Sequence, residues 1–346
     1  CLSWTTNHML NFHYDSFNKY CYLFTNRMKL LVFLTFFLIS CSGSGSSISD
    51  QESDQQSNNI DNNLVNFDCS AYSLNIEYCL ITQNSLNREI YFYKPTNITS
   101  SLNAPVLFSF HGGGGTALGN YAYSGFHQIA DSEKFYVVYP QGQFFQDKNS
   151  TGWVFNNNNN ISDDLFFMNQ VIDWVDTNYD INLDRIYSSG FSVGAIMSYD
   201  LACKLSNKIA AIAPVGGTMS TDTFNTCRPE KSKSVVHIHG ANDRILDPNG
   251  NQYIKSVNQS IEFWANFNQC TSFSSSNIQD NNLDGSSGTV NVHSNCNNQV
   301  SVSSVLLENY GHDWPSTRYQ NKNDDIDSAS YIWNFLKNYD LNGLIQ

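Results

Sequence analysis

Positive charge is scarce in this 346-residue sequence, which has 18 Lys and Arg residues against 31 Asp and Glu and a formal net charge of −13. No basic patch is available to displace counterions from phosphates, so nucleic acid is not expected as a partner. The nine cysteines include no CxxC pair, which argues against a zinc site. Neither a GK[ST] loop nor GxGxxG with a following acid occurs, so the usual phosphate-binding loops are not expected.

An apolar run at residues 30–39 has only ten residues, too few to span a bilayer as a helix. It follows Lys29 and ends in Leu-Ile-Ser-Cys, which resembles a bacterial lipoprotein signal. We therefore expect residues 1–27 to be over-extended upstream translation, 28–40 to be a lipoprotein-type signal peptide, and Cys41 to be the lipid anchor. A plain secretory signal peptide cleaved nearby is the alternative.

Residues 41–67 consist mainly of Ser, Gly, Asp, Gln and Asn, a composition that predicts a flexible polar linker. The chain is 41% hydrophobic, enough for one large globular domain, which we place at residues 68–346. Either interpretation of the leader exports the protein. We predict a cell-envelope lipoprotein at the outer membrane or cell surface, touching the membrane only through its anchor, with a secreted protein as the alternative.

Six cysteines remain in the predicted domain, an even number that suggests disulfides in an oxidising compartment. Fifteen pairings are possible for six cysteines. Pairing between sequence neighbours closes the shortest loops and is the one we expect: Cys69–Cys79, Cys203–Cys227 and Cys270–Cys296.

From about residue 86 the sequence alternates between strand and helix patterns. Continuous apolar runs such as "APVLFSFHGGGG" and "FYVVYPQG" are typical of buried strands, and "REIYFYKP" reads as an antiparallel edge strand. A polar insertion at 271–300 is closed by two cysteines. Helix patterns cover 163–179, 193–205, 252–267 and 325–336. This alternation predicts an α/β fold with a doubly wound, mostly parallel sheet in a single domain.

The stretch "GFSVG" places Ser192 between Gly190 and Gly194, after a strand pattern and before a helix pattern. That context is the one a nucleophile elbow requires. A tight strand-to-helix turn needs small residues two positions on either side of the serine, and the helix N-terminus favours negative charge developing above it. We therefore take Ser192 as the candidate nucleophile.

A serine nucleophile needs a base, which follows the acid in the chain order of this architecture. His237 and His239 lie on one face of a predicted strand and read as core imidazoles, whereas His293 lies in the polar insertion. His312, in "ENYGHDWPS", occupies a loop after a long apolar strand. His312 is therefore the candidate base.

The acid is expected in a loop between the serine and the histidine. Asp243, in "VVHIHGANDRILDP", lies three residues past Gly240 at the end of a predicted strand. Asp247 is the runner-up, although its place before Pro-Asn-Gly is typical of a turn. Asp243 is the candidate acid.

The stretch "HGGGG" ends another predicted strand, where the lack of side chains lets backbone N–H groups approach a ligand oxygen. We expect Gly113 and Val193 to donate these N–H groups as an oxyanion hole. Trp153 and Trp314 are candidate substrate-binding residues that could form a stacking wall, with a core role as the alternative. Asp163 and Asp164 are expected to stabilise a helix N-terminus rather than to act in catalysis.

Several motifs occur together and in order: "HGGGG", "YPQG", "SDDLFF", "GFSVGAIMSYDLACKLSNKIAAIAPVGG", "HIHGAND", "WANFNQC" and "GHDWP". Over residues 86–338 the chain resembles secreted α/β-hydrolases of the polyhydroxybutyrate depolymerase and feruloyl esterase type, including carbohydrate esterases of family one. The resemblance implies Ser192 as nucleophile, Asp243 as acid and His312 as base, with no metal or cofactor. Arg244 stands where the family often has proline.

The resemblance predicts an exported serine esterase. Its ester substrate, small or polymer-attached, would be a hydroxyalkanoate oligomer or a feruloyl or acetyl ester of a polysaccharide. Two alternatives remain: a catalytically inactive, surface-anchored binding protein of the same fold, and a serine peptidase of that fold. The intact set of serine, acid, histidine and glycines favours the esterase.

Overall fold

The computed structural model describes residues 65–83, 86–98, 103–154, 162–280, 287–317 and 325–346, all of which belong to one unit, Ile60–Gln346. The expectations for residues 1–27, the signal peptide at 28–40, the Cys41 anchor and nearly all of the linker lie outside the described residues. No helix among the described residues is long and apolar enough to cross a membrane.

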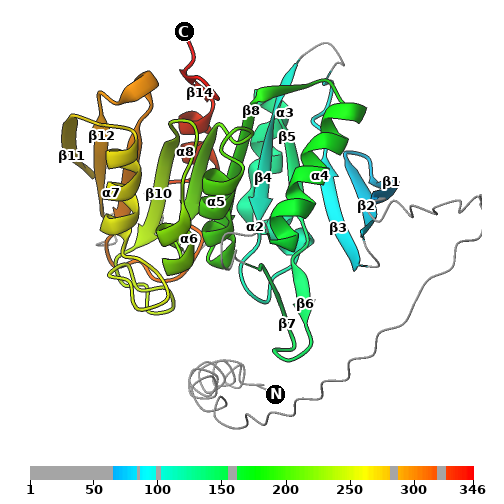
Figure 1. Ribbon diagram of the computed structural model, residues 1–346, viewed down its shortest axis with the longest axis horizontal. Coiled ribbons are helices and arrows are strands. Elements are labelled where there is room, and N and C mark those ends of the chain that lie inside the picture. Colours follow the sequence, from blue (N-terminus) through cyan, green and yellow to red (C-terminus); the bar gives the residue numbers. More distant parts are fainter. Residues whose placement is uncertain (1–64, 84–85, 99–102, 155–161, 281–286, 318–324) are drawn as a thin grey trace, which may run out of the picture. The chain divides into compact units, whose positions relative to one another are not determined.

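Eleven strands form one sheet in the order β1-β2-β3-β5-β4-β8-β9-β10-β13-β12-β11 (Figure 1). The central strands β5, β4, β8, β9, β10 and β13 run parallel, and the strands on both sides of them are antiparallel. The strand bounds are β1 Val65–Ser73, β2 Ile76–Gln83, β3 Leu86–Tyr93, β4 Ala104–Phe110, β5 Tyr136–Pro140, β8 Ile181–Phe191, β9 Ala211–Val215, β10 Ser234–Gly240, β11 Ser272–Ile278, β12 Gly288–Ser294 and β13 Val302–Leu307. The predicted α/β class and mostly parallel sheet are confirmed.

The antiparallel margins differ from expectation. The "REIYFYKP" strand, β3, is antiparallel but is not an edge strand, because β2 and then β1 continue the sheet beyond it. The polar insertion contains β11 and β12, whose antiparallel pairing with each other and with β13 extends the other margin. The β11–β12 hairpin is rich in serine and asparagine, and its low apolar content explains why it reads as a polar insertion.

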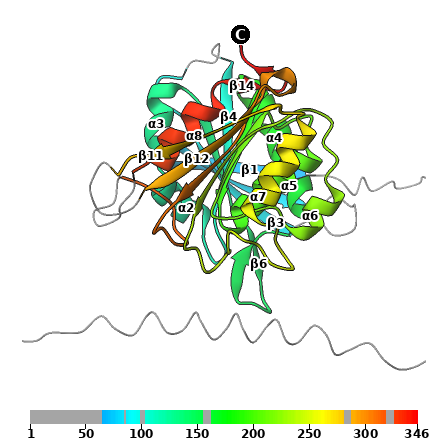
Figure 2. The ribbon, with the colours of Figure 1, turned by 90° about the vertical axis from the view of Figure 1, so that its left-hand side faces the viewer.

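Helices cover both faces of the sheet (Figure 2). Helices α4 (Asp163–Asn178), α5 (Val193–Lys204) and α7 (Val257–Phe267) bury apolar residues in one core cluster. Helices α2 (Ala117–Ser124), α3 (Phe126–Glu133) and α8 (Ser328–Leu336) do so in a second cluster on the opposite face. The arrangement is the doubly wound one, in which buried parallel strands lie between two layers of helices.

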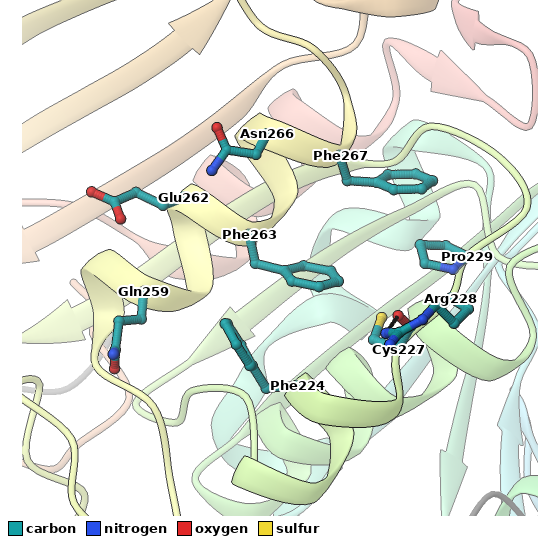
Figure 3. A pocket seen from close by; sticks show the side chains of 9 residues that line it. All are labelled: Phe224, Cys227, Arg228, Pro229, Gln259, Glu262, Phe263, Asn266 and Phe267. Carbon is teal, nitrogen blue, oxygen red and sulfur yellow. Dashed lines mark hydrogen bonds between the residues drawn. The ribbon is translucent and has the colours of Figure 1, made fainter.

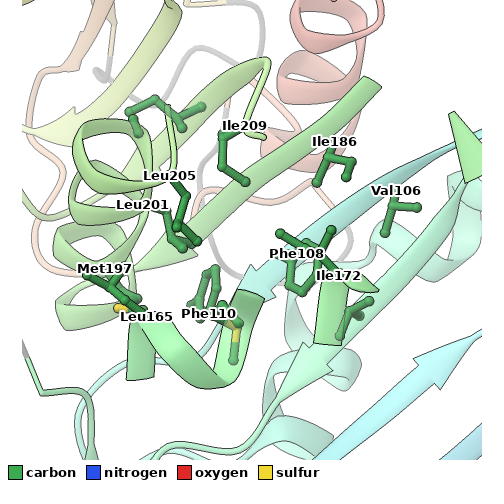
Figure 4. Packing of buried hydrophobic residues seen from close by; sticks show 14 of the residues in the cluster. Val106, Phe108, Phe110, Leu165, Ile172, Ile186, Met197, Leu201, Leu205 and Ile209 are labelled. Carbon is green, nitrogen blue, oxygen red and sulfur yellow. The ribbon is translucent and has the colours of Figure 1, made fainter. Parts of the chain in front are cut away.

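Side-chain caps define where the helices begin. The Ser162 hydroxyl accepts a hydrogen bond from Leu165 N at the start of α4. Helix α7 begins five residues later than predicted, because Ser256 forms a capping box with Gln259 and the preceding residues turn. Figure 4 shows the resulting core between the sheet and these helices, with Phe108 and Phe110 of β4 packed beside Met197 and Leu201 of α5.

Three disulfides join Cys69 to Cys79, Cys203 to Cys227 and Cys270 to Cys296. The first links directly opposed residues of β1 and β2, the second ties the end of α5 to the end of α6 (Thr221–Thr226), and the third closes the β11–β12 hairpin. Among the described residues, one cluster has metal-ligand spacing: Cys69, Cys79 and Glu77. Both of its sulfurs are committed to the disulfide.

Candidate active site

Ser192 sits between β8 and α5 with a backbone φ of 59°, in the left-handed region that is uncommon for non-glycine residues. Its N–H donates to the carbonyl oxygen of Val215 on the neighbouring strand over 2.9 Å. The turn therefore holds a strained serine between a strand end and a helix N-terminus, and strain of this kind often marks a functional site.

The glycines around Ser192 allow this tight packing. A Cβ atom at Gly190 would lie 2.4 Å from the carbonyl oxygen of Gly194. A Cβ at Gly194 would lie 2.4 Å from the carbonyl oxygen of Phe110 on β4, and one at Gly217 would lie 2.2 Å from that of Ser192. Because each contact is with backbone, none can be relieved by turning a side chain, and the "GFSVG" spacing follows from sterics.

His312 lies in the loop after β13, with its Nε2 2.9 Å from Ser192 Oγ. Its Nδ1 lies 2.6 Å from Asp243 Oδ2. The carboxylate can only accept, so Nδ1 donates and Nε2 is left to accept the serine proton. The side chain of His312 is 15% exposed, whereas that of Asp243 is fully buried. The structure thus brings together the three residues that the sequence predicted as nucleophile, base and acid.

Asp243 follows β10 and is held at both oxygens. Its Oδ1 accepts from the N–H groups of Ile245 and Leu246 over 2.8 and 2.9 Å, and its Oδ2 faces His312 and His239. Burial alone raises the pKa of the carboxyl, but the hydrogen bonds from His239 and His312 outweigh burial and hold it well below its usual range. Asp243 is therefore ionised wherever His312 can act as a base.

The glycine loop after β4 lies against the elbow. A Cβ at Gly112 would lie 3.3 Å from the Cβ of Ser192, and one at Gly113 would lie 3.7 Å from a methyl group of Val193. The N–H of Val193 is in the first turn of α5, where backbone donors have no partner within the helix. The structure therefore brings Gly113 and Val193, the expected oxyanion donors, next to each other and next to the serine.

A buried histidine supports this loop, a role that the sequence analysis did not assign. His111 Nε2 accepts from Gly142 N over 2.9 Å, so Nδ1 carries the proton and donates to Gly112 O over 2.7 Å. Burial lowers the pKa of His111 to about 4. The imidazole is consequently neutral at neutral pH, and its single N–H is directed at the backbone of the glycine loop.

Two further segments hold the same loop. The Thr151 hydroxyl donates to Gly115 O and its carbonyl accepts from Gly114 N, which attaches the loop to the β6–β7 hairpin (Gln143–Phe145 and Ser150–Gly152). The hairpin projects from the lower side of the sheet in Figure 1. The sequence feature that could have pointed to this support is the "YPQG" stretch. Its Gln141 side-chain oxygen accepts a hydrogen bond from Ala117 N at the start of α2.

The two candidate substrate-binding tryptophans are core residues. Trp153 is 5% exposed, packs edge-on against Phe110, and donates its Nε1–H to His111 O over 2.9 Å. Trp314 is 4% exposed and packs edge-on against Tyr123 and Phe126. Their burial favours the core alternative over an open stacking wall, and a substrate-binding role for either tryptophan stays a prediction.

Asp247, Asp164 and His293, also considered in the sequence, take part in a turn, an ion pair and a strand pairing, respectively. Asp247 caps a turn by accepting from Asn249 N, as its sequence context predicts. Asp164 is fully buried and pairs with Arg88 of β3, so it does more than stabilise the start of α4. His293 pairs with Val302 at the start of β13, whereas His312 follows the far end of that strand.

A separate open pocket of about 530 Å³ lies between α6 and α7 (Figure 3). Phe224, Phe263 and Phe267 form its apolar lining, and Gln259, Glu262, Asn266 and Arg228 are polar members. None of Ser192, Asp243 and His312 lines it. The pocket is therefore distinct from the candidate active site.

The chain is similar to known esterases in sequence and in fold. A bifunctional acetylxylan esterase/xylanase from Neocallimastix patriciarum is 27% identical over 75% of this chain and 35% of its own length. Feruloyl esterase B from Piromyces equi is 24% identical over 65% of this chain and 42% of its own length. The chain thus spans about a third to two fifths of these relatives. An acetyl xylan esterase structure from Aspergillus awamori superposes with a TM-score of 0.54 at 14% identity, covering 75% of this chain and 98% of that one, which supports the fold.

The family model described as phospholipase/carboxylesterase matches residues 106–280, about half of the chain. The matched span runs from β4 through the elbow and Asp243 to the end of β11. The chain belongs to the phospholipase/carboxylesterase family of α/β-hydrolases.

Proposed function

We propose that this protein is a serine esterase that hydrolyses carboxylic esters, with Ser192 as nucleophile, His312 as base and Asp243 as acid. The observation that carries the proposal is the continuous hydrogen-bonded path from Ser192 Oγ through His312 to Asp243, with contacts of 2.9 and 2.6 Å. A serine is activated when its hydroxyl lies within hydrogen-bonding reach of a base and a third group orients that base.

In the proposed reaction, His312 Nε2 accepts the hydroxyl proton as Ser192 Oγ bonds to the ester carbonyl carbon. The N–H groups of Gly113 and Val193 stabilise the resulting oxyanion. The C–O bond to the alcohol breaks and the alcohol leaves with the proton from His312. Water then loses a proton to His312 and attacks the acyl-serine, which regenerates the hydroxyl and releases the acid. Asp243 stabilises the imidazolium in both halves.

For the substrate, we propose acetyl or feruloyl esters carried on a polysaccharide, because the relatives include an acetylxylan esterase and a feruloyl esterase. Hydroxyalkanoate oligomers are the second class to test. The side chain of His312 is 15% exposed, so the base reaches solvent. An ester group on a large carrier would have to approach the serine from that side.

The test is hydrolysis by the full chain and by Ser192→Ala of p-nitrophenyl acetate and butyrate, methyl ferulate, acetylated xylan and hydroxybutyrate oligomers. We expect turnover by the parent of the acetyl or feruloyl substrates and none by the variant. Failure of the folded parent on every ester would contradict the esterase and favour an inactive binding protein. Cleavage of peptide substrates instead would favour a peptidase.

We further propose export as a lipoprotein anchored through Cys41, on the basis of Lys29, the apolar run at 30–39 and the Leu-Ile-Ser-Cys sequence. Several acyl chains on one cysteine suffice for stable membrane anchoring. Expression from Met28 with and without Cys41→Ala, followed by fractionation, tests this. The parent should partition into detergent and the variant should be released; equal release of both would favour a cleaved secretory signal.

A further inference from the structure

A chain of hydrogen bonds leads from the candidate acid into the core. His239 Nε2 lies 3.2 Å from Asp243 Oδ2, and His239 Nδ1 lies 3.0 Å from His237 Nε2. His237 Nδ1 in turn lies 2.9 Å from the Tyr199 hydroxyl on α5. All four side chains are at most 3% exposed, so water does not compete for these contacts.

One set of proton positions satisfies the whole chain. His239 Nε2 also lies 2.8 Å from the carbonyl oxygen of Leu246, which can only accept, so Nε2 carries the proton. Its Nδ1 is then an acceptor, and His237 Nε2 must donate to it. His237 Nδ1 is left as an acceptor, and the Tyr199 hydroxyl donates. The Nε2–H of His239 thus lies between Leu246 O, its closer acceptor, and Asp243 Oδ2.

Burial keeps these groups neutral. Burial, with a smaller effect of His239, lowers the pKa of His237 well below its usual value, and burial raises the pKa of Tyr199. Neither group therefore changes its protonation state in the neutral pH range.

We propose that His239 is a positioning residue of the active site, whose Nε2–H is shared between Leu246 O and the carboxylate oxygen that receives His312, and that His237 and Tyr199 fix the tautomer that makes this possible. The inference rests on the proposed function, because it assigns a role relative to the Ser192–His312–Asp243 path. "HIHGAND" thus supplies two histidines that act through the acid rather than as isolated core imidazoles.

The expected effect is electrostatic as well as steric. A second donor on Oδ2 disperses the negative charge of Asp243 and weakens its hold on a protonated His312. Removing the donor should stabilise the imidazolium and move the acid limb of the kcat/KM profile to higher pH. Ionisable groups next to members of this path in the chain are Arg244 and Asp247, which are exposed, Asp313, which follows the base, and the buried Asp200, which accepts from the Thr223 hydroxyl. All of these are unchanged in the variants below.

The activity test compares His239→Leu, which removes the donor, with His239→Gln, which keeps a donor and an acceptor, and with His293→Gln as a matched control. The pKa that governs the acid limb of the kcat/KM profile should rise by about half a pH unit to one pH unit in His239→Leu. It should return toward the parent value in His239→Gln and stay in place in the control. A folded His239→Leu protein with an unmoved acid limb would overturn the proposal.

Two measurements keep the proposal testable if that variant does not fold or if no ester is hydrolysed. Tyr199→Phe releases the His237 tautomer and should shift the acid limb in the same direction by a smaller amount. Nitrogen-15 NMR of labelled histidines in Ser192→Ala should show both His237 and His239 protonated at Nε2. An Nδ1-protonated His239 would overturn the proposal without bearing on the esterase assignment. Correct tautomers in a protein that hydrolyses no ester would contradict the proposed function alone.

Discussion

The Nε2 of His312 lies 2.9 Å from the Oγ of Ser192, although 120 positions separate the two residues in the chain. Ser192 follows β8 and His312 follows β13, both at the carboxyl ends of parallel strands. Loops at that edge of an open sheet converge, and for this reason distant residues can meet there. The contact makes the two side chains a unit whose members can be tested separately.

Replacing Ser192 by alanine should reduce kcat for ester hydrolysis by about four to six orders of magnitude, because the attacking oxygen is lost. The fold should survive, since the hydroxyl contributes only the contact with His312. Steady-state kinetics with circular dichroism would measure both effects. Substantial turnover in the purified variant would rule out Ser192 as the nucleophile.

His312→Ala should match Ser192→Ala in severity, whereas His293→Ala, near the end of β12 and opposite the start of β13, should keep nearly full activity. In the parent, activity should fall as pH drops below roughly 6 to 7, where histidines take up a proton and can no longer accept one. The measurement is kcat/KM against pH for the three proteins. An inactive His293→Ala variant would show that the base is misassigned.

His111 predicts a loss of stability in acid. Its pKa is about 4 in the folded protein, below the ordinary histidine value of about 6.5 in an unfolded chain. Between these values the unfolded chain binds the proton and the folded protein does not, so stability present above pH ~6.5 is lost as pH falls toward 4. The loss amounts to about 3 kcal/mol.

Thermal unfolding of the parent, His111→Gln and His293→Gln across this pH range tests the assignment. The first variant should show a shallower decline in Tm than the parent, and the second should follow the parent. Part of the decline in Tm should remain in His111→Gln, because burial also lowers the pKa of His237. An unchanged slope in His111→Gln would show that His111 does not carry the effect.

The buried disulfide between Cys203 and Cys227 should stabilise the protein by about 3 to 4 kcal/mol through the entropy of the unfolded chain. The Cys270–Cys296 bridge closes a loop of similar length, 26 positions against 24, and serves as the matched control. Replacing both cysteines of either bridge by alanine should remove a similar chain-entropy contribution to the free energy of unfolding, measured in urea. The pair at 203 and 227 should lose more, because both sulfurs are buried. Free thiols at these positions in protein from an oxidising compartment would contradict the bridge.

Sequence patterns predicted the central sheet and the chemistry at its edge because both depend on strong local signals. Continuous apolar runs identify β4, β5 and β10, and sterics at Gly190 and Gly194 fix the spacing around the serine. The β11–β12 hairpin escaped prediction, since β11 is almost wholly exposed and its large apolar residues are Phe273 and, at its end, Ile278. The β1 strand does alternate apolar and polar residues from Val65 to Cys69, but its start falls within the segment predicted as a linker.

Side-chain partners were harder to predict than positions. His237 and His239 are buried, as their placement on one face of a strand indicated, but their contact with Asp243 depends on how the loop after β10 folds back. Trp314 lies two positions after His312 and yet packs in the core, as Trp153 does. Contacts of this kind arise from tertiary packing, which local composition does not encode.

The bond between Cys69 and Cys79 also determines how the domain responds to tension along its N-terminal segment. Four residue pairs, from Val65 opposite Gln83 to Asp68 opposite Leu80, precede the cysteines in the β1–β2 ladder. A pull on the chain ahead of Val65 can peel away those pairs one at a time. The covalent link then transfers the force to β2, which is paired along its whole length with β3. Peeling therefore stops within the edge strand β1, and the loops that carry Ser192, Asp243 and His312, which follow the inner strands β8, β10 and β13, keep their spacing under mechanical load.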